Sequence, residues 1–329
     1  MTHKPQVNVL GSIVVNKQPA TLFLGQGLVH QRISSFGSVV KDCKAEHLPQ
    51  AGRFLRVGTL SGYRKEENEK VRDEGEGTFE LTLDFANGCN VSREWLSSVT
   101  MGLWPGPFGG GSYNGNNNGY ITTVETPLTL GSLSMVESSA DIQAHGEMVR
   151  VSGHFTLSFE GADAFIFCLT ENMEDGSVID HPEYNSKWAI KPPRLLEFGY
   201  RMANEINLKL SQREGLAKET IGPLVGPGFE PPPRSALGGA VRSGISIFKV
   251  DYRERTIKVK GQSDDVLEAV HKAITQSAFT KPPIFSSEKE VRFIFRPLVQ
   301  VKEGYYLFPN YCEPLLIPAE PFLDLITLS

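Results

Sequence analysis

Hydrophobic and polar residues alternate most regularly over residues 78–85, which read TFELTLDF. The apolar positions are Phe79, Leu81, Leu83 and Phe85. Residues 149–159 repeat this pattern. Because successive side chains of a strand point to opposite faces, both stretches are predicted to be strands with one buried face. Further strand candidates are residues 53–60, 245–252, 256–260 and 291–295.

The run FIFCL at residues 165–169 is apolar at every position. A short apolar run between polar residues is typical of a central strand that is covered on both faces. Thr170, Glu171 and Asn172 follow this run, so they either line a sheet edge or turn the chain.

Two stretches show helical spacing instead. Apolar residues recur at intervals of three and four over residues 195–210 and again over residues 264–276, where Ser263 stands at the N-cap position. In the first stretch these residues are Leu195, Phe198, Met202, Ile206 and Leu210. A third, weaker helix is predicted over residues 36–45. Many strands and few helices, in no regular alternation, predict an α+β fold with strand-rich mixed or antiparallel sheets and a few packed helices.

Two long stretches are too rich in Gly, Pro and Asn for regular structure: residues 105–119 (PGPFGGGSYNGNNNG) and residues 221–244. The chain is therefore predicted to be either a single α+β domain over residues 1–329 with two surface insertions, or two lobes, 1–220 and 245–329.

Composition narrows the class of protein. The net charge of −5 disfavours broad binding to nucleic acid, which needs a basic surplus, although a local basic groove stays open. The four cysteines are scattered, as in a reducing compartment. They are Cys43, Cys89, Cys168 and Cys312. No stretch reaches the ~20 apolar residues of a membrane span, so no membrane partner is expected and a cytoplasmic location is predicted.

Several common catalytic motifs are missing from the sequence: the G-x-S-x-G elbow, H-E-x-x-H, the P-loop, and G-x-G-x-x-G after a strand. Residues 54–77 are a stronger candidate. Arg56 lies in an apolar strand and needs either a carboxylate or a phosphate as partner, because an unpaired buried charge is costly. Asp73, Glu74 and Glu76 end a highly charged stretch that is either a solvated surface or a site.

Residues 279–295 (FTKPPIFSSEKEVRFIF) are the second candidate. If Val291, Phe293 and Phe295 form the buried face of a strand, the opposite face carries charged residues. These are Glu288, Glu290 and Arg292, together with Ile294. The alternation fits a surface ion-pair ladder and a catalytic face equally well.

Taken in order, the segments RVGTLSGYR, the acidic stretch, FCLT and the late FTK…EKEVRF strand resemble a group of prokaryotic proteins that is similar in layout to ADP-ribosyltransferase-like toxins and defence proteins. The resemblance covers about a fifth of the residues. It implies a split sheet, with NAD as substrate and no metal.

The resemblance also implies roles for individual residues. His30, or alternatively Arg32, would bind the ribose next to the nicotinamide, and Tyr63 would stack on the nicotinamide ring. Either Glu288 or Glu290 would hold the ribose hydroxyl and stabilise the oxocarbenium-like state. Arg56 or Arg64 would hold the pyrophosphate, with Thr59 of the Gly-Thr turn among the NAD-binding residues.

The predicted function is NAD-dependent ADP-ribosyl transfer to a macromolecule, either protein or nucleic acid, by a toxin or anti-phage effector. Such a protein is expected to have an antitoxin or an oligomeric partner. One alternative is a metal-dependent nuclease toxin built on Asp73, Glu74, Glu76 and Glu80, because clustered carboxylates bind Mg²⁺. The other is a non-catalytic binding or scaffold protein.

Overall fold

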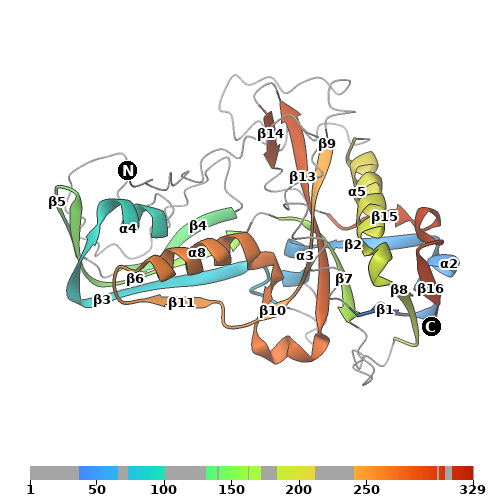
Figure 1. The fold of residues 1–329 in the computed structure, drawn as a ribbon, viewed down its shortest axis with the longest axis horizontal. Coiled ribbons are helices and arrows are strands. Elements are labelled where there is room, and N and C mark those ends of the chain that lie inside the picture. Colours follow the sequence, from blue (N-terminus) through green and yellow to red (C-terminus); the bar gives the residue numbers. More distant parts are fainter. Residues whose placement is uncertain are drawn as a thin grey trace, which may run out of the picture. The chain divides into compact units, whose positions relative to one another are not determined.

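The structure is a computed structural model that describes residues 37–65, 73–100, 131–138, 141–161, 163–171, 184–211, 241–301, 304–307 and 313–328. These residues form two compact units, each assembled from separate stretches of the chain (Figure 1). Unit 1 takes its described residues from Gly77–Ala162 and Arg255–Ser277. Unit 2 takes them from Val14–Glu76, Asp163–Glu254 and Ala278–Ser329.

Unit 1 is a five-stranded sheet covered by two helices. The strands run in the order β11-β3-β6-β4, with β5 also paired to β6. Their bounds are β3 Thr78–Ser92, β4 Gly131–Ser138, β5 Asp141–His145, β6 Met148–Gly161 and β11 Thr256–Val259. All pairs are antiparallel except β11 with β3. The helices are α4 (Arg93–Val99) and α8 (Asp264–Gln276), and Figure 1 shows α8 lying along β3 and β11.

The core of unit 1 confirms the predicted periodicities. Alternate residues of β3 are buried, and so are the predicted apolar residues of β6. On α8, Val270, Ala273 and Ile274 pack into the same core, and the Ser263 hydroxyl caps the helix by accepting from the Asp265 amide. Each of these elements buries one face only, so the polar positions between the apolar ones stay in water.

Unit 2 is a nine-stranded sheet with the path β14-β13-β7-β1-β8-β16, to which β2, β15 and β9 are joined. The strand bounds are β1 Val39–Cys43, β2 Phe54–Thr59, β7 Phe165–Glu171, β8 Ser186–Ile190, β9 Val241–Lys249, β13 Glu290–Val301, β14 Gly304–Leu307, β15 Leu315–Pro318 and β16 Ile326–Leu328. A separate parallel pair joins β10 (Asp251–Tyr252) to β12 (Thr280–Lys281). The α+β prediction with mixed and antiparallel sheets is thus confirmed.

The helical segments of unit 2 are short except for one. They are α2 Pro49–Gly52, α3 Leu60–Arg64, α5 Leu195–Ser211 and the 3₁₀ helices η1 Ala45–His47, η2 Pro192–Arg194, η3 Ser277–Phe279 (shared with the end of unit 1), η4 Pro283–Glu288 and η5 Glu320–Phe322. All five predicted apolar residues of α5 are buried. The helix approaches the sheet so closely that a Cβ at Gly199 would lie 3.1 Å from the Phe293 ring.

In the middle of the unit 2 sheet, β7 and β13 are covered on both faces. One face, the α5 face, carries Phe293 of β13 and Phe167 of β7 in the aromatic core beneath Phe198. The other face, here called the polar face, carries the residues of β13 and β7 that pair as Glu290 with Thr170, Arg292 with Cys168 and Ile294 with Ile166. Directly paired residues of antiparallel strands share a face, so these six side chains lie together.

One edge of β7 is divided between two strands. β1 pairs with β7 at Thr170 and Glu171, and β2 pairs with it at Phe165 and Ile166. From there β1 continues to β8 and β16, and β2 continues to β15. The sheet therefore forks at the middle of β7.

Some sequence-based predictions are corrected by the fold. Residues 39–43 form a strand and not the predicted helix, because Val39 and Val40 are β-branched and pair with both β7 and β8. Residues 241–244 were predicted to be loop, but they open β9. The predicted insertion 105–119, residues 221–240, His30, Arg32, Asn172 and Cys312 lie outside the described residues.

Candidate functional site

Arg292 is the centre of a buried ionic cluster on the polar face of unit 2. Its side chain is 1% exposed. The two Nη atoms donate to the two carboxylate oxygens of Glu76, at 2.6 and 2.8 Å. Nε and Nη2 donate to the Glu290 carboxylate, at 2.9 and 3.2 Å. Nη1 also donates to the Ala278 carbonyl at 2.5 Å. A guanidinium has five N–H donors, so every one of them has an acceptor. The carboxylates outweigh the effect of burial, which alone would lower the pKa of Arg292, and raise it well above its usual range.

Of the two interpretations that the sequence left open for β13, the surface ion-pair ladder is therefore wrong. The alternation of the strand is real, but both of its faces are covered. Arg292 and Ile294 are as fully buried as Val291 and Phe293.

Glu290 lies between two cations. Arg292 contacts one side of its carboxylate, and the Lys281 ammonium lies 3.0 Å from Oε2. Burial alone would raise the pKa of Glu290, but the Arg292 and Lys281 charges outweigh it and the pKa is lowered. Glu290 is thus a buried carboxylate that is ionised at neutral pH and paired with Arg292 and Lys281.

Glu288 was predicted to share the strand face of Glu290, but it does not belong to the strand. It ends η4, and Lys289 then adopts the left-handed conformation (φ 44°, ψ 45°) before β13 begins. Lys281 nevertheless brings the two carboxylates together, because its ammonium lies 2.5 Å from Glu288 Oε2. The Glu288 side chain is 14% exposed against 8% for Glu290. Burial, with the Glu290 charge nearby, raises the pKa of Glu288 despite Lys281.

Tyr63 lies on the same polar face. The Thr59 hydroxyl caps α3 by accepting from the Gly62 amide at 2.9 Å, and the helix then turns Tyr63 back over β2. A Cβ at Gly58 would lie 3.1 Å from Tyr63 Cε2, so glycine allows the ring to cover this strand. Burial, followed by the neighbouring Cys168 thiol and Glu290, raises the pKa of Tyr63 well above its usual range.

Cys168 connects Tyr63 to the ionic cluster. Its thiol is close enough to both Tyr63 and Glu290 to affect the pKa of each. Burial, followed by the Glu290 charge, raises the pKa of this thiol to about 12, so it is protonated at neutral pH. Tyr63 and the late carboxylates, far apart in the sequence, therefore converge in one place.

The remaining site candidates on residues 54–77 are Arg56, Thr59 and Arg64, which lie in three different environments. Arg56 was predicted to need a buried partner, but it is exposed, because β2 alternates and buries Leu55 and Val57 instead. Thr59 is buried as a helix cap. Arg64 Nε donates to the Glu76 carbonyl at 2.6 Å, which ties α3 to the end of the acidic turn.

Two of the acidic residues proposed for a metal, Glu76 and Asp73, have partners within the protein. Glu76 gives both carboxylate oxygens to Arg292, and Asp73 Oδ1 accepts from the Gly75 amide at 3.2 Å. Across the described stretches of chain, no group of three or more His, Cys, Asp or Glu side chains is arranged to hold a metal ion.

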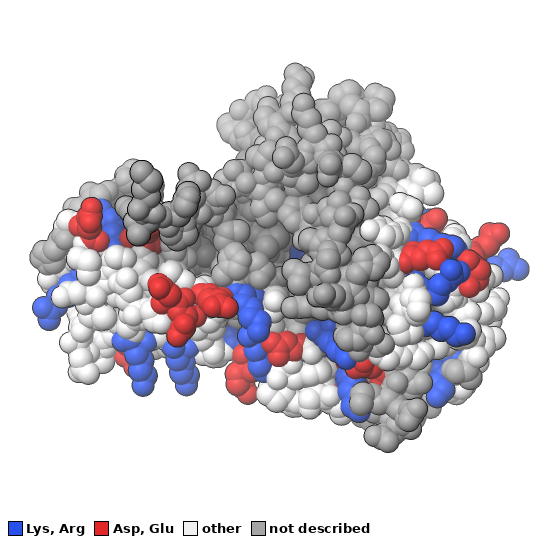
Figure 2. Space-filling view, viewed as in Figure 1, with Lys and Arg blue, Asp and Glu red and all other residues white. Residues whose placement is uncertain are grey.

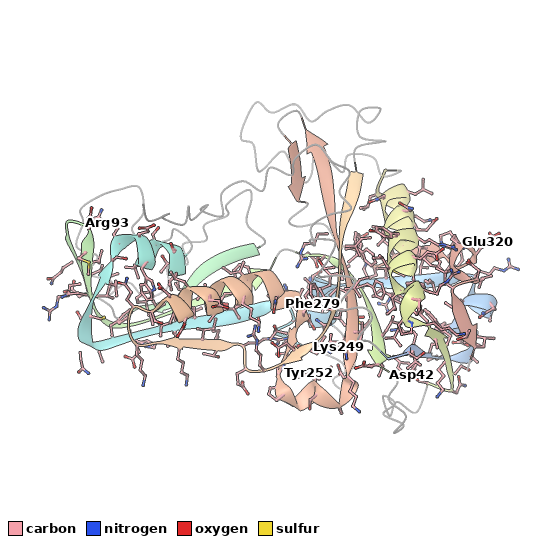
Figure 3. All side chains as sticks on the ribbon, viewed as in Figure 1. Asp42, Arg93, Lys249, Tyr252, Phe279 and Glu320 are labelled. Carbon is pink, nitrogen blue, oxygen red and sulfur yellow. The ribbon has the colours of Figure 1, made fainter. Side chains whose placement is uncertain are left out.

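Two residues of the cluster were missed by sequence reasoning, Lys281 and Tyr252. Lys281 is buried, and its position between Thr280 and Pro282 gives only a faint signal. Tyr252, labelled in Figure 3, accepts a hydrogen bond from the Glu290 amide at 2.8 Å. Its strand pairs with β12 in parallel, Tyr252 opposite Lys281, and no sequence pattern reveals that pairing.

On the face drawn in Figure 2, acidic and basic side chains are mixed over the described surface, without an extended field of either sign. None of the described helices combines the length and apolar character that a membrane span requires. Comparison with protein-family models, with curated proteins and with solved structures finds no match to this chain.

Proposed function

We propose that unit 2 transfers ADP-ribose from NAD to a macromolecule. The observation that supports this best is that Tyr63 lies near Glu290 and Cys168, and that Lys281 links Glu290 to Glu288. The fork at β7 is a second support, because the resemblance implies a sheet that is divided.

The two carboxylates suit different tasks. Glu290 is held by Arg292 and Lys281 from both sides, so it cannot turn toward a ligand without giving up its contacts with two buried cations. Among the described residues, Glu288 has a single partner in Lys281, and its side chain is more exposed than that of Glu290. Glu288 is therefore our choice for the carboxylate that meets the ribose hydroxyl and stabilises the positive charge that develops as nicotinamide leaves.

The other proposed contacts follow from position. The Tyr63 ring would stack on the nicotinamide, and the exposed guanidinium of Arg56, on the same side of β2 as Gly58, would reach the pyrophosphate. His30 or Arg32 would supply the early ribose contact. The acceptor would be a protein or a nucleic acid, as expected of a toxin or anti-phage effector controlled by an antitoxin or by assembly.

The test is nicotinamide release from NAD by the full chain, together with the NAD-dependent rise in melting temperature that linkage requires of a ligand that binds the folded state. E288Q should lower turnover by roughly 10²–10³-fold, the usual cost of losing one group that stabilises transition-state charge. E320Q, at an exposed carboxylate of η5 in the same unit, serves as the matched control. If folded E288Q and E290Q proteins both release nicotinamide at the wild-type rate, the proposal is wrong.

A non-catalytic binding role is the second candidate, and one observation favours it. Each N–H donor of the Arg292 guanidinium has an acceptor within the protein, as expected of an element that specifies a fold. This candidate predicts that wild-type protein neither gains stability from NAD nor releases nicotinamide.

A further inference from the structure

Tyr252 lies at the edge of the proposed site, where its phenol oxygen accepts a hydrogen bond but its proton is donated to no described residue. Its oxygen accepts from the Glu290 amide at 2.8 Å, which fixes the phenol beside the ionic cluster. A phenol also has one proton to donate. Within the part of the chain that the structure describes, no acceptor receives that proton.

Lys281 and Glu288 complete this edge. The ammonium spans Glu288 Oε2 at 2.5 Å and Glu290 Oε2 at 3.0 Å, and it lies 5.1 Å from the centre of the Phe285 ring. Lys281 is thereby immobilised, and it holds one oxygen of Glu288. Glu288 Oε1 has no partner among the described residues, so it is an acceptor that can take a ligand proton.

The edge thus offers a fixed donor, Tyr252, and a charged acceptor, Glu288. Burial, outweighing the hydrogen bond from the Glu290 amide, raises the pKa of Tyr252 to about 12, and the Glu290 and Glu288 charges act in the same direction. The phenol therefore keeps its proton throughout the physiological range. A vicinal diol matches this pair, because one hydroxyl can donate to a carboxylate while its oxygen, or that of its neighbour, accepts from a phenol.

We infer that Tyr252 is a specificity-determining residue that donates its phenol proton to the ribose diol next to the nicotinamide, which Glu288 holds from the other side. This inference rests on the proposed function and adds to it a residue and a part of the substrate. It also gives Lys281 a role as a positioning residue that orients Glu288.

The first test is Y252F, which keeps the ring and removes the proton. NAD binding measured by calorimetry should weaken by about 3- to 10-fold, the range for one neutral hydrogen bond. Y200F, at an exposed tyrosine of α5, is the matched control and should bind NAD as wild type does. An unchanged dissociation constant for folded Y252F overturns the inference.

The second test needs no substitution, so it holds even if Y252F does not fold. Wild-type protein is titrated with NAD and with analogues that lack the 2′- or the 3′-hydroxyl of the nicotinamide ribose. At least one analogue should bind about 3- to 10-fold more weakly than NAD. Equal affinities would mean that no diol is recognised here, although NAD turnover could still stand. If wild type does not bind NAD at all, the proposed function and this inference fall together.

Discussion

Units 1 and 2 both cover strand-rich sheets with helices, but they bury different chemistry. The buried side chains of unit 1 are apolar apart from Thr100 and Ser277 among its described residues. Unit 2 buries Glu76, Lys281, Glu290 and Arg292 in a single cluster. Unit 1 is thus held mainly by apolar burial, whereas unit 2 also depends on the exact pairing of charges taken out of water.

This difference has a consequence for where function can lie. Ionised groups are costly to bury, so a cluster of them needs complete pairing or a ligand. The cluster of unit 2 is fully paired around Arg292, while its outer members, Glu288 and Tyr252, keep groups that no described residue contacts. The inner part is a rigid support, and the outer part is where a ligand can be recognised.

The largest expected effect is the loss of Arg292. R292L should lower the free energy of unfolding of unit 2 by about 3–5 kcal/mol, because Glu76 and Glu290 would stay buried without their partner. Hydrogen exchange should accelerate in β7 and β13 while protection of β3 and β6 in unit 1 is unchanged.

The matched change in unit 1 is L83A, at a fully buried residue of β3. It should cost about 2–5 kcal/mol through lost apolar burial and the cavity left behind, and its exchange effects should stay in unit 1. The triple variant R292L/E290L/E76L should recover much of the loss in unit 2, because apolar residues can replace a buried ionic group. A cost below about 1 kcal/mol for R292L would show that the cluster does not hold unit 2 together.

The same contrast explains how much could be predicted from the sequence. In unit 1, β3, β6 and α8 each bury one face, so the period of their apolar residues indicated the elements and the core together. In unit 2, β13 buries both faces. The alternation of its residues could therefore not show whether the Arg292 side chain is exposed to solvent or buried in the protein. Its partner Glu76 lies in a turn that is distant along the chain, and the periodicity of neighbouring residues cannot predict such a contact.

Glu288 and Arg56 were misjudged for different reasons. Glu288 was assigned to the strand because alternation appeared to continue, whereas Lys289 adopts a left-handed conformation that is uncommon outside glycine. For Arg56 the alternation of β2 was visible and already placed Leu55 and Val57 inside. Tyr63 lies near Glu290, and the spacing of these residues along the chain could not have indicated their proximity.

Acid should affect the two carboxylates of the cluster in opposite directions. The pKa of Glu290 is lowered on folding, so its contribution to stability is present above the unfolded value of ~4.3 and is lost as pH falls toward the folded value. The pKa of Glu288 is raised on folding, so ionised Glu288 opposes folding above its folded pKa, and protonation relieves this as pH falls.

Denaturant unfolding between pH 7 and pH 3 separates these effects. E290Q should cost about 1–3 kcal/mol at pH 7, as for hydrogen bonds to charged groups, and should flatten the loss of stability in acid. E288Q should change stability at pH 7 by less than about 1 kcal/mol and should steepen that loss. If the two variants gave the same pH profile, the assignment of Glu290 as the support and Glu288 as the free carboxylate would have to be reversed or abandoned.

The smallest expected effect compares one helix cap in each unit. Ser263 caps α8 in unit 1 and Thr59 caps α3 in unit 2, each by accepting from a backbone amide. S263A and T59A should each lower the free energy of unfolding by about 1 kcal/mol, measured by denaturant titration. Only T59A should also weaken NAD binding, because α3 carries Tyr63 over Gly58 and loss of the cap lets that ring move. Equal NAD affinity of the two variants would mean that Tyr63 is held by its buried contacts alone, or that it does not contact the ligand.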